Sequence, residues 1–577
     1  MYLQFKIGHE VLDLYAKTKA KFTYYNPAFR KSGGRSLPFT IPKTPKNLRL
    51  TGFVDRLDTV TSQKVENASV WLGGIPFDFG VIKMKSASDR SIEIYFEQTL
   101  TDLQKEFEAV KIKTLSNTIN VGTPSWKMIF EQVATPTTLH YAIEINGVVY
   151  EYTATSTTDF ATIKIALRDA VNADYPSMLT IQPDTFTIEG NSPVVLKLVS
   201  TGSLNVVSQI LYEDSVKALW TTYLNNPNVD GLVFPCISNY KLLQNNGKWI
   251  GEINFYKDAA YQFNGYYDNE NDFRFSTIPY VMLSNILEQL EAQFGFQFAG
   301  AFMSLTDIQN LFLLHNQAIN QRLQGMLLND EFINLPSTNF DTGIFLADIT
   351  AKELVEGFLQ LFCLASFWSE IHQTLTPISK ADLLNTEVED WTTKTLKTYK
   401  VVSSERQGYR IEYTNDKTDT TSNTHNQPIV VGNGHKVYKL PVASAITRNV
   451  YGEAGFRELL YMEQINSGDF SPRLGIYKGL QPGASGELYP KAIALALSDI
   501  YTTYWQPWAD FLNTAKKLDK SFDLTINDLL KLRTFQEPMK RVESEKGTVN
   551  GMISEFSFEA DANGLSDTDI EIYTVSV

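Results

Sequence analysis

The sequence lacks the residues and patterns from which most active sites are built. Its 577 residues include only two cysteines, and these lie in unrelated apolar contexts: Cys236 in VFPCIS and Cys363 in LFCLAS. Neither a disulfide framework nor a cysteine-based zinc site can be made from such a pair. We therefore predict two buried thiols.

Histidines are equally few and do not combine into a metal-binding pattern. None of the six forms HExxH or another pair with metal-ligand spacing. His425 and His435 share one polar loop, which leaves a metal hypothesis beside the simpler interpretation of a solvated loop. His315, in LFLLHNQ, is predicted to be a polar residue at a helix surface. The others are His9, His140 and His372.

Two acidic loops resemble calcium loops but lack their defining residues. They are Asp268–Asp272 and Asn415–Asp419. Neither has the glycine at the sixth position or the glutamate at the twelfth that an EF-hand uses to turn and to bind the ion through two oxygens. Calcium binding at either loop is the lesser alternative.

Catalytic motifs are absent as well. The sequence has no GxSxG elbow, no GxxxxGK[ST] loop and no strand-linked GxGxxG, and the glycines of Val431–Gly434 lack a following helix that could bind phosphate. A glycosidase needs two catalytic carboxylates, and no such pair can be singled out among 65 acidic residues. The sequence therefore predicts a non-enzymatic protein, without catalytic, cofactor-binding or metal-ligating residues and without a cofactor.

Long apolar runs and clustered basic charge are also missing. The N-terminal MYLQFKIGHEVLDLY alternates polar and apolar residues, and no stretch of about 18 residues is apolar. We expect neither a signal peptide nor a membrane span, and folding in a cytoplasm. With 51 basic and 65 acidic residues the net charge is −14. This balance argues against wrapping a DNA duplex, although an acidic surface can repel nucleic acid from a channel wall.

The chain is rich in short stretches with the pattern of β-strands and in aromatic residues, with 28 Tyr and 35 Phe. The stretch Ser36–Phe96 reads as a series of short strands broken at Gly73-Gly74, at Gly80 and at 86–90. Its prolines, at 38, 42 and 45, are expected to exclude a helix. A capping box at Thr101–Gln104 then predicts a short helix to about Leu115.

Further patterns predict an insertion, a helical middle region and a second β unit. HYAIEINGVVYEYTATS predicts a hairpin turning at Asn146-Gly147, followed by a helix over Asp159–Asn172 and two more strands. Residues 204–275 should supply strands that complete the first unit. Helices are expected from Ile278 to Gly295, after Thr306, and from Thr350 to about Trp368. After residue 400, strands and a polar loop precede an amphipathic helix over Asp499–Lys516, with a kink or break at Pro507, and closing strands.

The expected fold class is α+β, β-rich and multidomain. It comprises two small β-barrel-like tube domains, an inserted ββαββ module and a helical middle region. The predicted segments are 1–125 (first β-barrel domain, first part), 126–202 (ββαββ module), 203–275 (first β-barrel domain, second part), 276–398 (mixed helical domain) and 399–577 (second β-barrel domain with a decorating helix).

Several of these stretches together resemble a known family. They are LPFTIPKTPKNLRLTGFVDRL, GGIPFDFGVIKMKSASDRSIEIYF, STIPYVMLSNILEQLEAQFGFQFAG, DITAKELVEGFLQLFCLASFW with VEDWTTK, SPRLGIYKG, and SDIYTTYWQPWADFL. In spacing and aromatic placement they resemble the tail hub proteins of phages and prophages of Bacteroidetes hosts, and the chain is similar to the myophage baseplate hub.

The resemblance implies two similar β-barrel domains side by side in one protomer. Three protomers then form a ring with six barrel positions, which adapts a six-fold tail tube to a three-fold spike or fibre. The implied partners are two further copies of the chain, a tail tube or distal tail protein, a central spike or fibre protein, DNA in transient passage without specific binding, and the host cell envelope. The implied location is the virion tail tip or baseplate, assembled in the bacterial cytoplasm. The module at 126–202 departs from this pattern and is expected at the periphery.

Two alternatives remain open at the level of sequence. One is a host-surface protein that grips glycans with its aromatic residues and the inserted module. The other is a cell-wall hydrolase fused to a tail part, for which the sequence offers no nucleophile or metal constellation.

Overall fold

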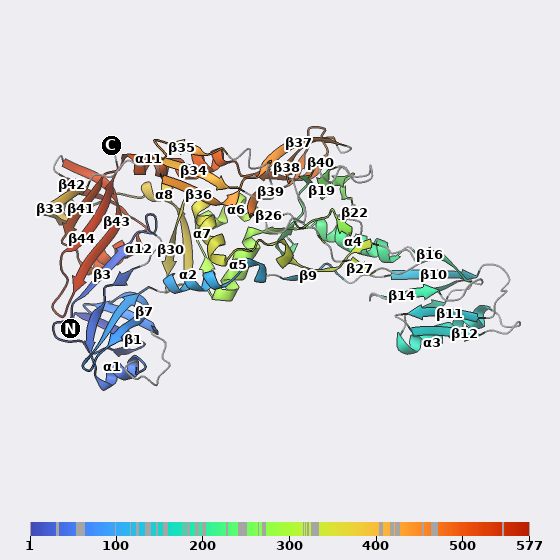
Figure 1. The fold of residues 1–577 in the computed structure, drawn as a ribbon, viewed down its shortest axis with the longest axis horizontal. Helices are drawn as coiled ribbons and strands as arrows, with labels where there is room; N and C mark the ends of the chain where they lie inside the picture. The colour runs from blue at the N-terminus through green and yellow to red at the C-terminus, as the bar shows by residue number, and fades with distance from the viewer. Residues whose placement is uncertain are drawn as a thin grey trace.

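A computed structural model of the chain shows a mixed α+β, strand-rich molecule with several separate sheets, which confirms the expected fold class. It is elongated, with both termini near one end and β10 to β14 at the other (Figure 1). The structure describes residues 2–575 apart from 31–33, 54–63, 99, 116, 123–125, 133–139, 146–147, 154–159, 177–178, 182–184, 191–195, 199–203, 210, 227–228, 240–250, 263–264, 268–272, 316, 318, 320–321, 325–333, 403–407, 416–420, 422–426, 435, 453–454, 463–470 and 545–546.

The largest sheet has fourteen strands and is built from both ends of the chain. Its order is β2-β1-β6-β7-β8-β4-β3-β43-β44-β41-β33, with β5 on β8, β42 on β43 and β32 on β42. The first β unit comprises β1 (Leu3–Ile7), β2 (Glu10–Val11), β3 (Ala20–Tyr25), β4 (Arg35–Ser36), β5 (Phe39–Pro42), β6 (Lys64–Leu72), β7 (Ile75–Ala87) and β8 (Ser91–Glu97). The second comprises β32 (Glu389–Asp390), β33 (Thr395–Val402), β41 (Lys517–Phe522), β42 (Met539–Ser544), β43 (Gly547–Ala560) and β44 (Thr568–Thr574). The pairs of the described strands close neither unit into a barrel.

The two units join where β3 pairs antiparallel with β43 over six residue pairs. Phe22 lies opposite Phe558 and Tyr24 opposite Phe556, and these rings stack at 5.3 and 5.0 Å between centroids. Phe77 of β7 meets the Phe558 ring edge-on at 5.5 Å. All five rings are at most 1% exposed. Because cross-strand aromatic pairs are the unit that stabilises a sheet, the units share one core.

The strand predictions for Ser36–Phe96 are largely confirmed, with two corrections. β6, β7 and β8 form as expected and turn at Gly73-Gly74. However, Pro45 begins the helix α1 (Pro45–Leu50), because proline fits the first helical turn and the Thr44 side chain accepts a hydrogen bond from the Asn47 N–H. Gly80 does not break β7 either. It is needed because a Cβ there would lie 2.3 Å from the Glu97 carbonyl oxygen.

The inserted segment forms two sheets rather than one. The predicted hairpin is confirmed as β11 (His140–Ile145) and β12 (Val148–Thr153), while Asn146-Gly147 itself lies outside the described residues. These strands join β15 (Leu196–Leu198), whereas β10 (Trp126–Gln132), β13 (Leu179–Ile181), β14 (Thr185–Gly190) and β16 (Leu204–Gln209) form a second sheet. The expected helix is α3 (Phe160–Asp174), with Leu167 and Val171 fully buried; the side chains of Phe160 and Ile163 lie outside the described residues.

The expectation for 204–275 is wrong in two respects. Residues 211–224 form the helix α4 (Leu211–Leu224), which buries Val216, Trp220 and Leu224 at helical spacing. None of the described strands between 229 and 275 pairs with the first β unit. Instead, β17 (Leu232–Val233) and β18 (Ile237–Ser238) join middle sheets that also contain strands from residues 446–494. The strand that continues the sheet of the first unit is β43, which pairs with β3. The division into domains remains a prediction.

Two middle sheets combine distant parts of the chain. One orders β17, β24 (Tyr280–Met282), β26 (Leu311–Leu314), β39 (Arg473–Pro482) and β40 (Leu488–Ala494); the other orders β19 (Glu252–Ile253), β18, β38 (Gly455–Tyr461) and β37 (Ile446–Gly452). Two three-stranded sheets order β25 (Gln297–Phe298), β31 (Thr374–Ser379), β30 (Leu364–Ser369), and β35 (Ile429–Val431), β34 (Tyr409–Thr414), β36 (Lys436–Ala443). The two-stranded pairs are β9 (Thr118–Asn120) with β29 (Asn339–Asp341), β20 (Tyr256–Lys257) with β21 (Ala260–Tyr261), β22 (Gly265–Tyr267) with β23 (Phe273–Phe275), and β27 (Arg322–Gln324) with β28 (Asn334–Pro336).

Two of the predicted helices begin away from their expected residues. α2 (Leu100–Ala109) already includes Thr101, so this residue does not cap it. α5 (Leu283–Phe294) begins after β24 rather than at Pro279, and it ends at Gly295 in the left-handed conformation, as expected.

The two predicted capping boxes after residue 300 differ in outcome. In α6 (Thr306–Gln309) the cap position belongs to Leu305. The box of Thr350 and Glu353 is confirmed and opens α7 (Ala351–Leu361). That helix stops seven residues short of Trp368, because Cys363 turns with φ 51° into β30.

The amphipathic helix near the C-terminal end is confirmed. It runs through α10 (Leu497–Ile500), a π-helical turn (Tyr501–Trp505) and α11 (Gln506–Thr514). The π turn lies directly before Pro507, which has no N–H to donate to the preceding turn. Two further helices complete this half, α8 (Lys380–Leu384) and α12 (Ile526–Thr534).

Candidate functional site

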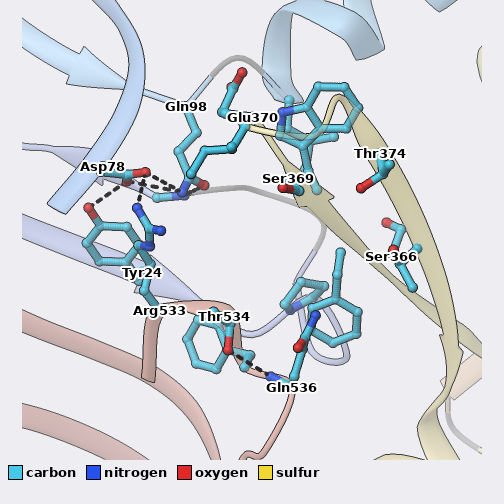
Figure 2. Close-up of a pocket in the computed structure, with 18 of the residues that line it drawn as sticks. Tyr24, Asp78, Gln98, Ser366, Ser369, Glu370, Thr374, Arg533, Thr534 and Gln536 are labelled. Carbon is cyan, nitrogen blue, oxygen red and sulfur yellow. Dashed lines mark hydrogen bonds and ion pairs between the residues drawn. The ribbon is translucent and has the colours of Figure 1, made fainter. Parts of the chain in front are cut away.

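A cavity of about 260 Å³ lies where the first β unit, helix α12 and the β30–β31 hairpin meet. Figure 2 shows Asp78, Tyr24, Gln98 and Arg533 on one side of it and Ser366, Ser369 and Thr374 of the hairpin across from them. The cavity therefore marks the point at which three distant parts of the chain are held together.

Asp78 organises the polar side of this junction. It follows Phe77 in β7 and is 2% exposed. Tyr24 Oη donates to its Oδ2 at 2.8 Å, and Gln98 Nε2 donates to both carboxylate oxygens at 3.3 and 3.1 Å. Arg533 Nη1 donates to Oδ1 at 2.8 Å and also to the carbonyl oxygen of Phe77. Strands β3 and β7, the end of β8 and helix α12 are thus tied to one carboxylate.

Arg533 reaches this position because helix α12 is held by a capping box at its N-terminus and by buried leucines on its inner face. Thr525 and Asp528 form a capping box, and Asp528 Oδ1 accepts from Lys394 Nζ at 2.7 Å. Leu529 and Leu532 are buried on the inner face, which leaves Arg533 in the last turn beside the Phe77 ring, at 5.7 Å from its centroid. A cation in the last turn also complements the helix dipole.

Burial dominates the electrostatics of this cluster. It raises the pKa of Asp78, and the Arg533 guanidinium opposes this rise most strongly. Burial also raises the pKa of Tyr24 well above its usual value, with the Asp78 charge adding to the effect. A buried ion pair of this kind is costly to break, because the remaining charge has no access to water.

The arrangement is suited to holding segments together rather than to chemistry on a substrate. Both oxygens of Asp78 are occupied by side-chain donors, and Oδ1 also accepts from the Phe79 N–H at 2.9 Å. The hydrogen bond between His372 and Ser369 uses the His372 backbone N–H and not its ring. Within the described part of the chain, no group of three His, Cys, Asp or Glu side chains could hold a metal ion.

The prediction of two buried thiols is confirmed. Cys236 is 0% and Cys363 1% exposed, and both are free. Burial raises the pKa of Cys363 to about 12, and that of Cys236 is also strongly raised by burial. Both are therefore protonated and unreactive at neutral pH.

The prediction for His315 is wrong. It follows β26 and is 1% exposed, stacked on the Phe345 ring at 4.8 Å. Its Nε2 bonds the Pro279 carbonyl oxygen at 2.7 Å, and its Nδ1 accepts from the Gln317 N–H at 3.1 Å. Burial lowers its pKa to about 4. This burial could not be predicted from the sequence, because a single polar residue after an apolar run fits a helix surface equally well.

The other candidate residues are not brought together. His9 is exposed in the turn after β1, His140 lies in β11 opposite Thr153, and His372 is exposed between β30 and β31. His425, His435, the loop Asp268–Asp272 and residues 416–419 of the second acidic loop lie outside the described residues. The Asp78–Arg533 pair was missed, because the alternation of a strand predicts that a carboxylate between two phenylalanines faces solvent on the side opposite to them.

No protein-family model matches the sequence, and no curated protein matches it either. The chain is similar to two tail proteins of known structure. One is the 43 kDa tail protein of prophage MuSo2 from Shewanella oneidensis, with 7% identity, a TM-score of 0.33, and coverage of 99% of this chain and 97% of that one. The other is the tail protein from Neisseria meningitidis MC58, with 7% identity, a TM-score of 0.31, and coverage of 99% and 96%. With identities and scores this low, neither likeness assigns a function to the chain.

Proposed function

We propose that the chain is a structural, non-enzymatic bacteriophage tail protein. More finely, we propose a homotrimeric hub that joins a six-fold tail tube to a three-fold spike or fibre and forms part of the genome-ejection channel. One observation carries the proposal: the β units from the two ends of the chain lie side by side and share one core through β3 and β43. This supports the proposal because the resemblance to tail hubs implies two β units placed side by side in one protomer.

A symmetry adaptor needs two β units whose relative position is fixed. The paired strands and stacked rings at the junction provide this, and so does Asn26, whose N–H and Nδ2 donate to the carbonyl oxygens of Ser554 and Ile553 at 2.8 and 2.7 Å. Three copies of a rigid pair present six units around one axis.

The ends of the large sheet also suit a closed ring. Among the described strands, β33 is paired only with β41 and ends the order of the sheet. Its Val401 is 56% exposed. Open sheet edges invite pairing with another chain, and a closed ring covers such edges.

The acidic balance of the chain suits a channel that lets DNA pass without holding it. On the second unit, one sheet face carries the carboxylates of Asp519, Asp569, Glu555 and Glu571, of which Glu555 pairs with Arg30 and Glu571 with Lys517. Binding of a DNA backbone requires clustered cations instead. The proposed location is the tail tip or baseplate of the virion, assembled in the bacterial cytoplasm. The proposed neighbours are a tube or distal tail protein and a spike or fibre.

The inserted module lies far from the junction, at the opposite end of the molecule (Figure 1), which suits a peripheral contact with another tail protein or the host envelope. The exposed large hydrophobic side chains among its described residues are Val148, Val149 and Ile165, all aliphatic. Aliphatic groups favour a protein contact over stacking on sugars, so these described side chains do not point to glycan binding.

The oligomeric state tests the proposal directly. Light scattering after size exclusion should give three times the chain mass of 65.2 kDa, and electron microscopy should show three-fold particles with a central opening. Val401→Lys at the β33 edge should weaken the trimer, whereas Val149→Lys on the module should leave it intact. A monomer at assembly concentrations, or a basic inner surface of the ring, would contradict the proposal. A peptidoglycan zymogram should stay blank, and a cleared band would support the hydrolase alternative.

A further inference from the structure

Strand β37 forms an open edge of one of the middle sheets, at the outer margin of the molecule (Figure 1). The order of that sheet is β19-β18-β38-β37, so β37 is paired on one side only. Its residues pair with β38 in one continuous antiparallel register. Among the described residues, no other backbone hydrogen bond is recorded for this strand. Alternate residues of an antiparallel edge direct their N–H and C=O groups outward, and these groups are therefore open to another strand.

Strand β37 differs from β33, β36 and β40, which also end their sheets. Edge strands are usually protected from pairing by lysine, proline, a bulge or short length. β36 contains two lysines and a proline, β40 contains Pro490 and Lys491, and the pairing of β33 with β41 is interrupted by a register shift. The sequence of β37, ITRNVYG, has no lysine and no proline, and its register has no shift. It therefore permits another strand to be added.

Large apolar side chains are exposed beside this edge. Tyr451 of β37 is 83% exposed, and Phe456, which lies opposite it in β38, is 39% exposed. The tip of the β39–β40 hairpin is bonded to the same place, because the Ala484 N–H donates to the Phe456 carbonyl oxygen at 3.1 Å. On the two sides of this tip, Leu480 and Leu488 are 51% and 52% exposed. An apolar side chain of an added strand would thus meet an uncovered aromatic pair.

The charges near the edge are engaged within the chain. Arg448 is the one charged residue in the sequence of β37, and its guanidinium lies over the Tyr461 ring at 3.8 Å. In β38, Glu458 pairs with Lys491 at 2.9 Å and Arg457 is buried against Glu252. The affinity of an added strand must therefore come from backbone hydrogen bonds and apolar contacts, as is usual where a peptide extends a sheet.

We propose that β37 accepts an extended segment of a different protein as an additional strand. Only another extended backbone satisfies a row of outward N–H and C=O groups, and Tyr451 with Phe456 favours an apolar residue in that segment. A second copy of the chain fits less well, because pairing β37 with β37 creates a two-fold axis that the proposed three-fold ring does not contain. The choice of occupant thus rests on the proposed function, whereas the open edge belongs to each copy by itself.

Hydrogen-exchange mass spectrometry on the full chain tests this, with acetyl-GFRELLY-amide as the probe. This peptide has the sequence of β38, which already fits the other edge of β37 in an antiparallel register. At about 1 mM peptide, exchange in β37 should slow about tenfold and in a saturable manner. The peptide acetyl-GFRPLLY-amide should have no such effect, because its proline removes a donor from the middle of the strand.

A double variant separates the edge from the rest of the surface. Asn449→Lys combined with Tyr451→Lys replaces two exposed side chains of β37 by cations and should weaken binding of the peptide about tenfold. Val430→Lys is the matched control and should bind as the parent does. Val430 is 55% exposed and lies on β35, an edge strand of another sheet.

Three results would overturn the proposal. One is exchange in β37 that stays unaltered up to about 1 mM peptide. Another is equal binding by the parent and by the double variant, whose unaltered thermal unfolding would show that it is folded. The third is protection of β37 that rises with chain concentration without peptide and is lost in the double variant, which would assign the edge to a second copy. A monomeric chain that binds the peptide would contradict the hub while supporting strand addition at β37.

Discussion

Replacing Arg533 by methionine should loosen both terminal β units at once. Methionine retains an apolar stem beside Phe77 but leaves the Asp78 carboxylate, 2% exposed, without its cation. Removing one partner of a buried pair costs about 3–5 kcal/mol. At about 1.4 kcal/mol per factor of ten, local opening should become roughly 10² to 4 × 10³ times more frequent.

Hydrogen-exchange mass spectrometry is the suitable assay, because a chain of this size need not unfold in one step. Peptides covering β7 and α12 should exchange faster by this factor, although their sequences are more than four hundred residues apart. Adding Asp78→Asn to Arg533→Met should restore much of the protection, since the unpaired charge is then gone.

Arg49→Met is the matched control. Arg49 pairs with Glu10 at 2.5 Å, but their side chains are 56% and 45% exposed, so water replaces the lost contact and exchange should hardly change. If Arg533→Met altered exchange no more than Arg49→Met, the buried pair would not be holding the units together.

Three further predictions concern other parts of the fold. Because burial lowers the pKa of His315 to about 4 while the unfolded residue titrates near 6.5, stability should fall by up to roughly 3 kcal/mol as the pH drops through this range. His315→Gln should flatten that part of the profile in pH-dependent thermal unfolding; an unchanged slope would argue against this. Thr350→Ala should cost about 1 kcal/mol in exchange protection of α7, whereas Thr306→Ala, which removes no cap, should cost less than about 0.5 in α6. Gly80→Ala places a Cβ 2.3 Å from a backbone oxygen of β8 and should lower the melting temperature, unlike Gly564→Ala, which has open space; equal melting temperatures would contradict the crowding.

The sequence predicts local structure well where a short signal is enough. The capping box at Thr350, the left-handed Gly295 and the hairpin after β11 depend on residues within one or two turns, and all three are confirmed. The helix α4 was missed although Val216, Trp220 and Leu224 have helical spacing, because its flanking β-rich stretches suggested strands.

Pairing between distant segments could not be predicted. The alternation of β3 predicts a strand, but nothing in it specifies β43 as its neighbour in place of a strand from 204–275. The same holds for the candidate site. Asp78 finds Arg533 only through the packing of α12, whose sequence lies far from that of β7. Such contacts are set by tertiary packing, which local propensity does not encode.

The pairing of β3 with β43 has a consequence for synthesis. Strand β3 leaves the ribosome early, whereas its partner β43 begins only at Gly547. The β3 edge and the aromatic rings beside it therefore stay unpaired while the intervening residues are synthesised. Contacts so far apart in sequence form slowly. A chain interrupted before Gly547 keeps that edge open and cannot form the fourteen-stranded sheet. Only chains translated at least through β43 can therefore complete this sheet.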